Sequence, residues 1–245
     1  MILVFGGTKD GREIINLLLT KGYKVIASTA TEYGINLLSN HPNLKKIHGK
    51  LDFEEICTLI KTEKVTTIID ATHPYAVEIS QNIIKVSTHL KIKAIRYDRP
   101  SVNRSNITKL NSYVEINYYL KQHKGNILLT IGANNLNLIT KVVDKNRIIA
   151  RLLPVSSSLK KAENAGLKPS QIIAIQGPCS TELNSSLLKQ FNIKYLVTKD
   201  SGYEGGLVQK LEAAQQNNVE VIMLSRPQLP YKWVVNGIDD INKML

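Results

Sequence analysis

The chain has 245 residues, of which 32 are basic and 20 acidic, so its formal net charge is +12. Hydrophobic residues make up 43% and charged residues 21%, a balance that allows a buried core and excludes intrinsic disorder over most of the length. No apolar run approaches the roughly 18 residues of a membrane helix, and residues 1–6 lack the basic start of a signal peptide, so we expect a cytoplasmic protein with no membrane partner.

Short apolar runs alternate with segments of helical period along the first hundred residues. Buried strands are predicted at residues 2–5, 24–27, 65–69 and 92–95, with a weaker candidate at 44–47. Helices are predicted between them, at residues 12–20, 53–60 and 76–87. This alternation is typical of βαβ units and predicts an α/β fold with a parallel sheet and right-handed crossovers.

The second half repeats the order of the first. Residues 127–132 align with 2–7, residues 195–198 with 67–70, and residues 221–227 with 94–100, at offsets of 125 to 128 residues. Each Arg-Pro pair is followed by an irregular stretch and a closing helix, at 111–120 or 236–245. We therefore expect two Rossmann-like parallel-sheet domains of similar topology, 1–105 and 106–245, facing each other across an interdomain cleft. Two unrelated βαβ domains would look similar as well.

Polar loops follow the predicted strands, where open α/β sheets bind their ligands. The turn Gly6-Gly7-Thr8 opens a helix, and its glycines would let the backbone approach a phosphate at the helix N-terminus. It departs from G-x-G-x-x-G, because Thr8 stands at the second glycine, so a turn that needs glycine only for its shape is equally consistent. After the second strand, Ser28 and Glu32 would lie near an adenosine ribose, although Glu32 also suits the first turn of a helix.

Two further loops carry most of the remaining polar groups. Asp70-Ala71-Thr72-His73-Pro74-Tyr75 follows a strand of the first half, and Lys199-Asp200-Ser201-Gly202 follows the equivalent strand of the second. Arg99 and Arg226 could bind carboxylates with their guanidinium groups or tie down the loops after their strands. Tyr195 and Lys199 match a short-chain dehydrogenase spacing, but that pair needs a helix and this segment is predicted as a strand.

Composition indicates which classes of ligand the protein binds. The five histidines are dispersed and the two cysteines lie outside any metal-binding spacing, so no metal site is predicted. The basic residues are scattered and aromatic residues make up only 6%, which does not favour nucleic acid. The charge favours instead a small molecule with many carboxylates.

These segments together resemble the precorrin-6A reductase and cobalt-precorrin-6A reductase family of cobalamin biosynthesis. The matching segments span nearly the whole chain: Gly6-Gly7-Thr8 with Arg12-Glu13, Asp70-Ala71-Thr72-His73-Pro74-Tyr75-Ala76, Arg99-Pro100, Thr130-Ile131-Gly132, Gly177-Pro178 with Glu182, Lys199-Asp200-Ser201-Gly202, Lys210 with Ala213-Ala214, and Arg226-Pro227. The resemblance implies hydride transfer from a reduced nicotinamide to the corrin precursor, giving precorrin-6B or its cobalt form. It also implies that nicotinamide and tetrapyrrole meet in the interdomain cleft. Independently of the resemblance, we expect a monomer.

The resemblance also implies residue roles. The cofactor-binding candidates are Gly6, Gly7 and Thr8 for the pyrophosphate, Ser28 and Glu32 for the adenosine, and Asp70, Ala71 and Thr72 beside the nicotinamide. The substrate-binding candidates are Arg99, Lys199, Ser201, Gly202, Tyr203 and Arg226. The candidate proton donors are His73, Tyr75 and Asp200, with water or the substrate itself as alternatives.

Two positions depart from the family pattern. NADPH-using relatives carry an Ala-Gly-Arg-like segment where this chain has Ala30-Thr31-Glu32, which resembles the anaerobic, cobalt-first branch and favours NADH over NADPH. Tyr203 stands where a glycine is usual, so its side chain is a candidate substrate contact. Three other functions remain: a nicotinamide reductase for another polyanion, a dinucleotide-sensing module without turnover and, least favoured, a nucleic-acid binder.

Overall fold

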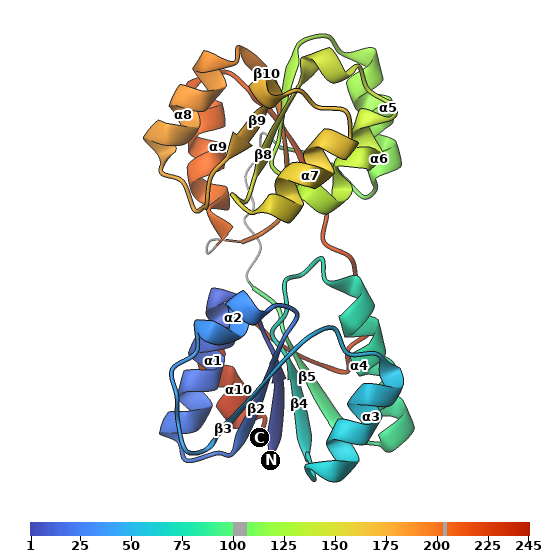
Figure 1. Cartoon of the computed structure of the whole chain (residues 1–245), viewed down its shortest axis with the longest axis vertical. Helices are drawn as coiled ribbons and strands as arrows, with labels where there is room; N and C mark the ends of the chain where they lie inside the picture. Colours follow the sequence, from blue (N-terminus) through green and yellow to red (C-terminus); the bar gives the residue numbers. More distant parts are fainter. Residues whose placement is uncertain (100–106, 203–204) are drawn as a thin grey trace. The chain divides into compact units, whose positions relative to one another are not determined.

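The computed structural model describes residues 1–99, 107–202 and 205–245. The chain divides into two units, residues 1–100 with 227–245, and residues 101–226 (Figure 1). Each unit contains one six-stranded sheet in which every pair of neighbouring strands is parallel. The α/β class predicted from the alternation of strands and helices is confirmed.

The first unit is built around β1, whose four residues are all buried. Its strands are β1 (Ile2–Phe5), β2 (Val25–Thr29), β3 (Leu44–His48), β4 (Thr67–Asp70), β5 (Lys93–Tyr97) and β12 (Trp233–Val235). Its helices are α1 (Lys9–Thr20), α2 (Glu32–Asn36), α3 (Phe53–Thr62), α4 (Val77–Leu90) and α10 (Ile238–Lys243). The strand order, β12-β5-β4-β1-β2-β3, is that of a Rossmann fold.

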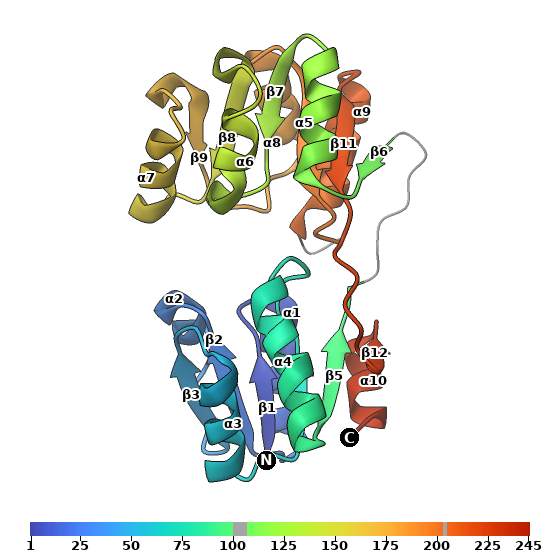
Figure 2. The same ribbon diagram turned by 90° about the vertical axis from the view of Figure 1, so that its right-hand side faces the viewer.

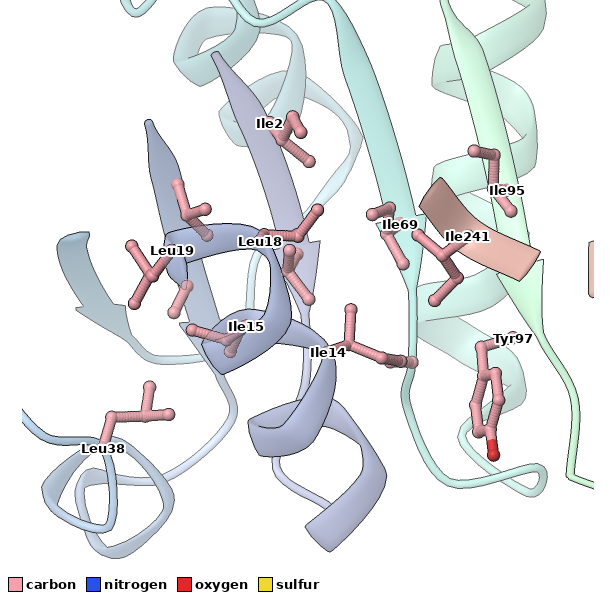
Figure 3. Packing of buried hydrophobic residues seen from close by; sticks show 14 of the residues in the cluster. Ile2, Ile14, Ile15, Leu18, Leu19, Leu38, Ile69, Ile95, Tyr97 and Ile241 are labelled. Atoms are coloured by element: carbon pink, nitrogen blue, oxygen red, sulfur yellow. The ribbon is translucent and has the colours of Figure 1, made fainter. Parts of the chain in front are cut away.

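Both faces of this sheet are covered, which explains why β1, β2 and β4 are buried along their whole length rather than at alternate residues. Helices α1, α2 and α10 cover one face, where Ile14, Leu18 and Ile241 pack against Ile69 and Ile95 (Figure 3). Helices α3 and α4 cover the other face. The sheet therefore exposes chiefly its edges and the two ends of its strands.

The second unit repeats the same order. Its strands are β6 (Ile107–Leu110), β7 (Asn126–Leu129), β8 (Ile148–Leu152), β9 (Ile172–Ala174), β10 (Ile193–Lys199) and β11 (Glu220–Leu224), arranged β6-β11-β10-β7-β8-β9. Its helices are α5 (Tyr113–Gln122), α6 (Leu136–Thr140), α7 (Ser156–Asn164), α8 (Thr181–Gln190) and α9 (Leu207–Gln216), with short 3₁₀ turns η1 (Ala133–Asn135), η2 (Lys145–Arg147) and η3 (Pro169–Gln171). Helices α8 and α9 cover one face, and α5, α6 and α7 lie on the other (Figure 2).

The domain boundaries differ from the predicted division into 1–105 and 106–245. Residues 227–245 return to the first unit, where β12 pairs with β5 in the register Trp233↔Ile95 and Val235↔Tyr97 and α10 contacts α1. Both chain ends consequently belong to the same unit (Figure 2). The sixth strand of the second sheet, β6, comes from the start of the predicted second domain and pairs with β11.

Candidate active site

The carboxyl ends of β1 and β4 form the switch point of the first sheet, since the chain proceeds from β1 to β2 and β3 on one side and to β4 and β5 on the other. Ligands of open α/β sheets bind at this position. The loop after β1 carries Gly6, Gly7 and Thr8, and the loop after β4 carries Asp70 to Tyr75. Most of the predicted cofactor-binding residues therefore lie together at the carboxyl ends of β1 and β4.

The turn after β1 has the geometry of a phosphate-binding turn. Gly7 has φ +108°, which favours glycine, and an added Cβ there would meet no atom within 4 Å. Thr8 is the N-cap of α1: its hydroxyl accepts a hydrogen bond from the Gly11 amide at 3.0 Å and donates to the Ala71 carbonyl at 3.1 Å. A Cβ on Gly11 would lie 3.1 Å from the Gly6 Cα, so close packing requires this glycine. The remaining first-turn amides of α1 have no intrahelical acceptor.

Asp70 does not face solvent. Its carboxylate is fully buried, forms an ion pair with Arg96 at 2.8 Å and accepts hydrogen bonds from hydroxyl groups. A direct contact with nucleotide, as predicted for Asp70, would require these bonds to break. Ala71 is also buried, whereas the half-buried Thr72 donates to Asp70 through its amide and hydroxyl.

His73 and Tyr75 lie further along the same loop, both half-buried, with ring centroids 5.6 Å apart. The His73 Nδ1 accepts a hydrogen bond from the Tyr75 amide at 3.3 Å, and the His73 carbonyl accepts one from Ala76. A neutral imidazole that accepts at Nδ1 carries its proton on Nε2. Both side chains therefore belong to the loop at which the nicotinamide is predicted to bind.

The two adenosine candidates lie at the end of β2. Ser28 is buried in that strand, and Glu32 is exposed in the first turn of α2, which Thr31 caps through a hydrogen bond from the Gly34 amide. The position of Glu32 in the first turn of α2 fits the helix-dipole interpretation, because the N-terminal end of a helix favours a carboxylate. Its contact with a ribose stays a prediction.

Arg99 and Arg226 each form an ion pair inside their own unit. The Arg99 Nε contacts Asp10 Oδ2, and these side chains are 10% and 3% exposed. Arg226 binds Asp200 twice, through Nε to the carbonyl at 3.0 Å and through an outer nitrogen to Oδ1 at 3.1 Å. This geometry favours the interpretation that these arginines tie down loops rather than present open guanidinium groups to a substrate.

The predicted substrate loop of the second unit follows β10. Lys199 is half-buried, and burial lowers its pKa below the ordinary lysine value, while Asp200, Ser201 and Gly202 are buried. The Ser201 hydroxyl donates to the Gly205 carbonyl at 3.3 Å, which closes the loop on itself. Tyr203 lies outside the described residues. Strand β10 runs through Lys199, which confirms that the spacing from Tyr195 to Lys199 is not a helical dehydrogenase pair.

Several buried or half-buried polar residues near the carboxyl ends of the strands were not predicted as site residues. Arg96 and Tyr231 contact Asp70, and Lys210 donates to the Thr198 hydroxyl at 3.3 Å directly behind the loop after β10. Burial lowers the pKa of Lys210 to about 7, and the Arg151 charge acts in the same direction. No local sequence signal identifies Arg96 or Tyr231, since their partner lies 26 and 161 residues away.

A cavity of about 480 Å³ lies away from the site loops, between the end of α4 and the start of β5 and β12. None of the predicted site residues line it. Within the described ranges no group of three or more metal-ligating side chains forms. Across those same ranges, no helix is long and apolar enough to cross a bilayer.

The family model described as precorrin-6x reductase CbiJ/CobK matches residues 1–245. The cobalt-precorrin-6A reductase of Priestia megaterium is 34% identical over 98% of this chain and 96% of its own, and that of Methanocaldococcus jannaschii is 34% identical over 100% and 97%. The solved structure of CobK precorrin-6A reductase has a TM-score of 0.82 at 20% identity, covering 100% of this chain and 95% of its own, which establishes the fold. On this evidence, the chain belongs to the precorrin-6x reductase CbiJ/CobK family of oxidoreductases.

Proposed function

We propose that the protein reduces one carbon–carbon double bond of cobalt-precorrin-6A to give cobalt-precorrin-6B, with NADH as the preferred hydride donor. The observation that carries the proposal is a Rossmann strand order with a glycine turn at its switch point, in a chain of this family. The relatives from Priestia megaterium and Methanocaldococcus jannaschii, both named for the cobalt form, support the choice of substrate.

The residues of the first unit fit a dinucleotide. Gly6 and Gly7 give the backbone room for the pyrophosphate, and backbone amides at the start of α1 would donate to it. Glu32 would accept hydrogen bonds from the ribose hydroxyls, and its charge would repel a 2′-phosphate. The bound nicotinamide supplies the hydride, and the half-buried side chains of Thr72, His73 and Tyr75 would orient its ring.

Reduction adds a hydride to one carbon of the double bond and a proton to its neighbour. His73 is a proton-donor candidate in the loop assigned to the nicotinamide, and to donate it would first take up a proton at Nδ1, which gives up the hydrogen bond from the Tyr75 amide. Asp200 is a weaker candidate, since Arg226 and burial hold its carboxylate in place. Lys199 and Ser201 would bind substrate carboxylates, and the +12 charge would attract them from a distance.

The test is anaerobic turnover of cobalt-precorrin-6A, with oxidation of NADH and then of NADPH followed at 340 nm beside the tetrapyrrole spectrum. Gly7→Ala and Gly22→Ala make a matched pair, because both glycines have positive φ and open space around the added methyl. Gly22 lies in the turn after α1, at the opposite end of that helix from Gly7. We expect Gly7→Ala to lose nucleotide binding and Gly22→Ala to keep it. Stoichiometric nucleotide binding without oxidation, for both forms of the substrate, would indicate a sensing module instead.

A further inference from the structure

Tyr231 connects the returning segment of the chain to the loop after β4. It lies two residues before β12, and its hydroxyl is 2.6 Å from Asp70 Oδ2 and 3.1 Å from the Ser80 carbonyl oxygen. Its ring packs against the apolar cluster formed with α3 and α4. Burial and the Asp70 charge both raise the pKa of Tyr231, so the phenol stays protonated and donates.

The carboxylate of Asp70 binds five donors that reach it from different parts of the fold. Its Oδ1 accepts from the Thr72 amide at 3.0 Å, from the Thr72 hydroxyl at 2.6 Å and from Arg96 at 2.8 Å. Its Oδ2 accepts from the Ser80 hydroxyl and from Tyr231, each at 2.6 Å. Because the carboxylate is fully buried and bonded to these donors, it does not contact a ligand directly in this arrangement, and it positions the loop that it holds.

The origin of these donors separates Tyr231 from the others. Thr72 and Ser80 are close to Asp70 in sequence, and Arg96 lies on the neighbouring strand β5. Within the described chain, Tyr231 is the donor to Asp70 that comes from beyond the second unit. A hydrogen bond to a charged acceptor in a buried site is stronger than an exposed neutral one. Loss of the hydrogen bond from Tyr231 to Asp70 would make the loop after β4 less rigid, while the Tyr231 ring would keep its apolar contacts.

We propose that Tyr231 is a positioning residue: through Asp70 it holds the loop of residues 70–75 in the conformation that binds the nicotinamide end of the nucleotide. The inference rests on the proposed function in one respect, the assignment of this loop to the nicotinamide. That Tyr231 restrains the loop through Asp70 follows from the contacts alone. The C-terminal segment would thereby contribute to nucleotide affinity without touching the nucleotide.

Tyr231→Phe in the full-length protein tests this proposal, because it removes the hydroxyl and keeps the ring. In the nucleotide-free protein we expect amide hydrogen exchange of residues 71–76 to become about tenfold faster. The KM and Kd for the nucleotide should rise by a similar factor, while kcat at saturating nucleotide and the KM for the tetrapyrrole stay within about twofold. Tyr113→Phe is the control, because the Tyr113 hydroxyl is buried and bonded to no group of the described chain.

Ser80→Ala is a second variant that deletes the other hydroxyl donor to the same Asp70 oxygen and should loosen the same loop. If Tyr231→Phe lowers the melting temperature but leaves both loop exchange and nucleotide affinity unchanged, the role is only structural and the proposal is overturned. If Tyr231→Phe does not fold, unchanged loop exchange in Ser80→Ala would overturn it. A wild-type protein that binds no nicotinamide nucleotide would refute the proposed function, whereas exchange in the nucleotide-free protein would still decide the role of Tyr231.

Discussion

Arg99 could bind a substrate carboxylate or neutralise the buried Asp10, and disrupting their ion pair would distinguish the two roles. Asp10 lies in the first turn of α1, next to the glycine turn, with its side chain 3% exposed. Arg99→Gln would leave this carboxylate buried and uncompensated. Removing one partner of a buried pair costs about 3–5 kcal/mol of folding free energy. Arg99→Gln combined with Asp10→Asn leaves two neutral amides, and most of that loss should be recovered.

The same change should weaken nucleotide binding. Asp10 lies two residues after Thr8, so its unpaired charge would repel a pyrophosphate bound at the glycine turn. At an effective dielectric constant near 20, two like unit charges separated by roughly 7 Å repel each other by about 2 kcal/mol, or about thirtyfold in affinity. The double variant should bind nucleotide nearly as well as the wild type, because the repelling charge is gone.

Urea unfolding and nucleotide titration of the wild type, the two single variants and the double variant measure both effects. Trp233 is the single tryptophan of the chain and lies in β12, so its fluorescence reports unfolding of the unit that contains the pair. Lys50→Gln is the control, because Lys50 pairs with Glu78 at an exposed site and its loss should change neither quantity. Unchanged stability and nucleotide affinity in Arg99→Gln, with a raised KM for the tetrapyrrole, would refute this reasoning and restore the substrate-binding role.

Two further predictions concern charge. Glu32→Ala should raise kcat/KM for NADPH about tenfold relative to that for NADH, measured as initial rates with each nucleotide, and an unchanged ratio would show that Glu32 does not contact the ribose. Burial lowers the pKa of Lys210 to about 7 from its ordinary value of 10.5, so between these values the unfolded chain holds a proton that the folded chain lacks. Wild-type stability should therefore rise with pH relative to Lys210→Met, by up to about 1.4 kcal/mol per unit between pH 7 and 9 in urea unfolding, and parallel profiles would contradict the shift.

The sequence predicted those parts of the fold that local patterns determine. The apolar run of residues 2–5 corresponds to the whole of β1, and the closing helix predicted at 111–120 is α5 at Tyr113–Gln122. Strand β12 was missed, because Trp233–Val235 is only three residues long and lies at an exposed edge. Its partner β5 lies more than 130 residues away, and no local pattern encodes that choice of partner.

The candidate site divides in the same way. The glycine turn and the loop after β4 could be located because backbone conformation and strand ends leave local signals. The partners of the charged residues could not, since Arg99 and Asp10 are 89 residues apart and meet only when β5 and α1 fold onto one sheet. An arginine after a strand has the same sequence pattern whether it binds a ligand or a buried carboxylate.

The strand order offers a structural explanation for the two Arg-Pro pairs. A proline lacks the amide that a parallel ladder requires, so a strand that reaches Arg-Pro does not extend its ladder through that residue. Both pairs stand where the chain leaves one unit for the other, after β5 and after β11. In each case the arginine binds an acid of the unit that the chain is leaving, Asp10 or Asp200. The free edge of β5 is then covered by β12, and that of β11 by β6. The ion pairs of the two arginines fit an anchored exit point, used once in each half of the chain, and substrate binding by Arg99 and Arg226 stays a prediction.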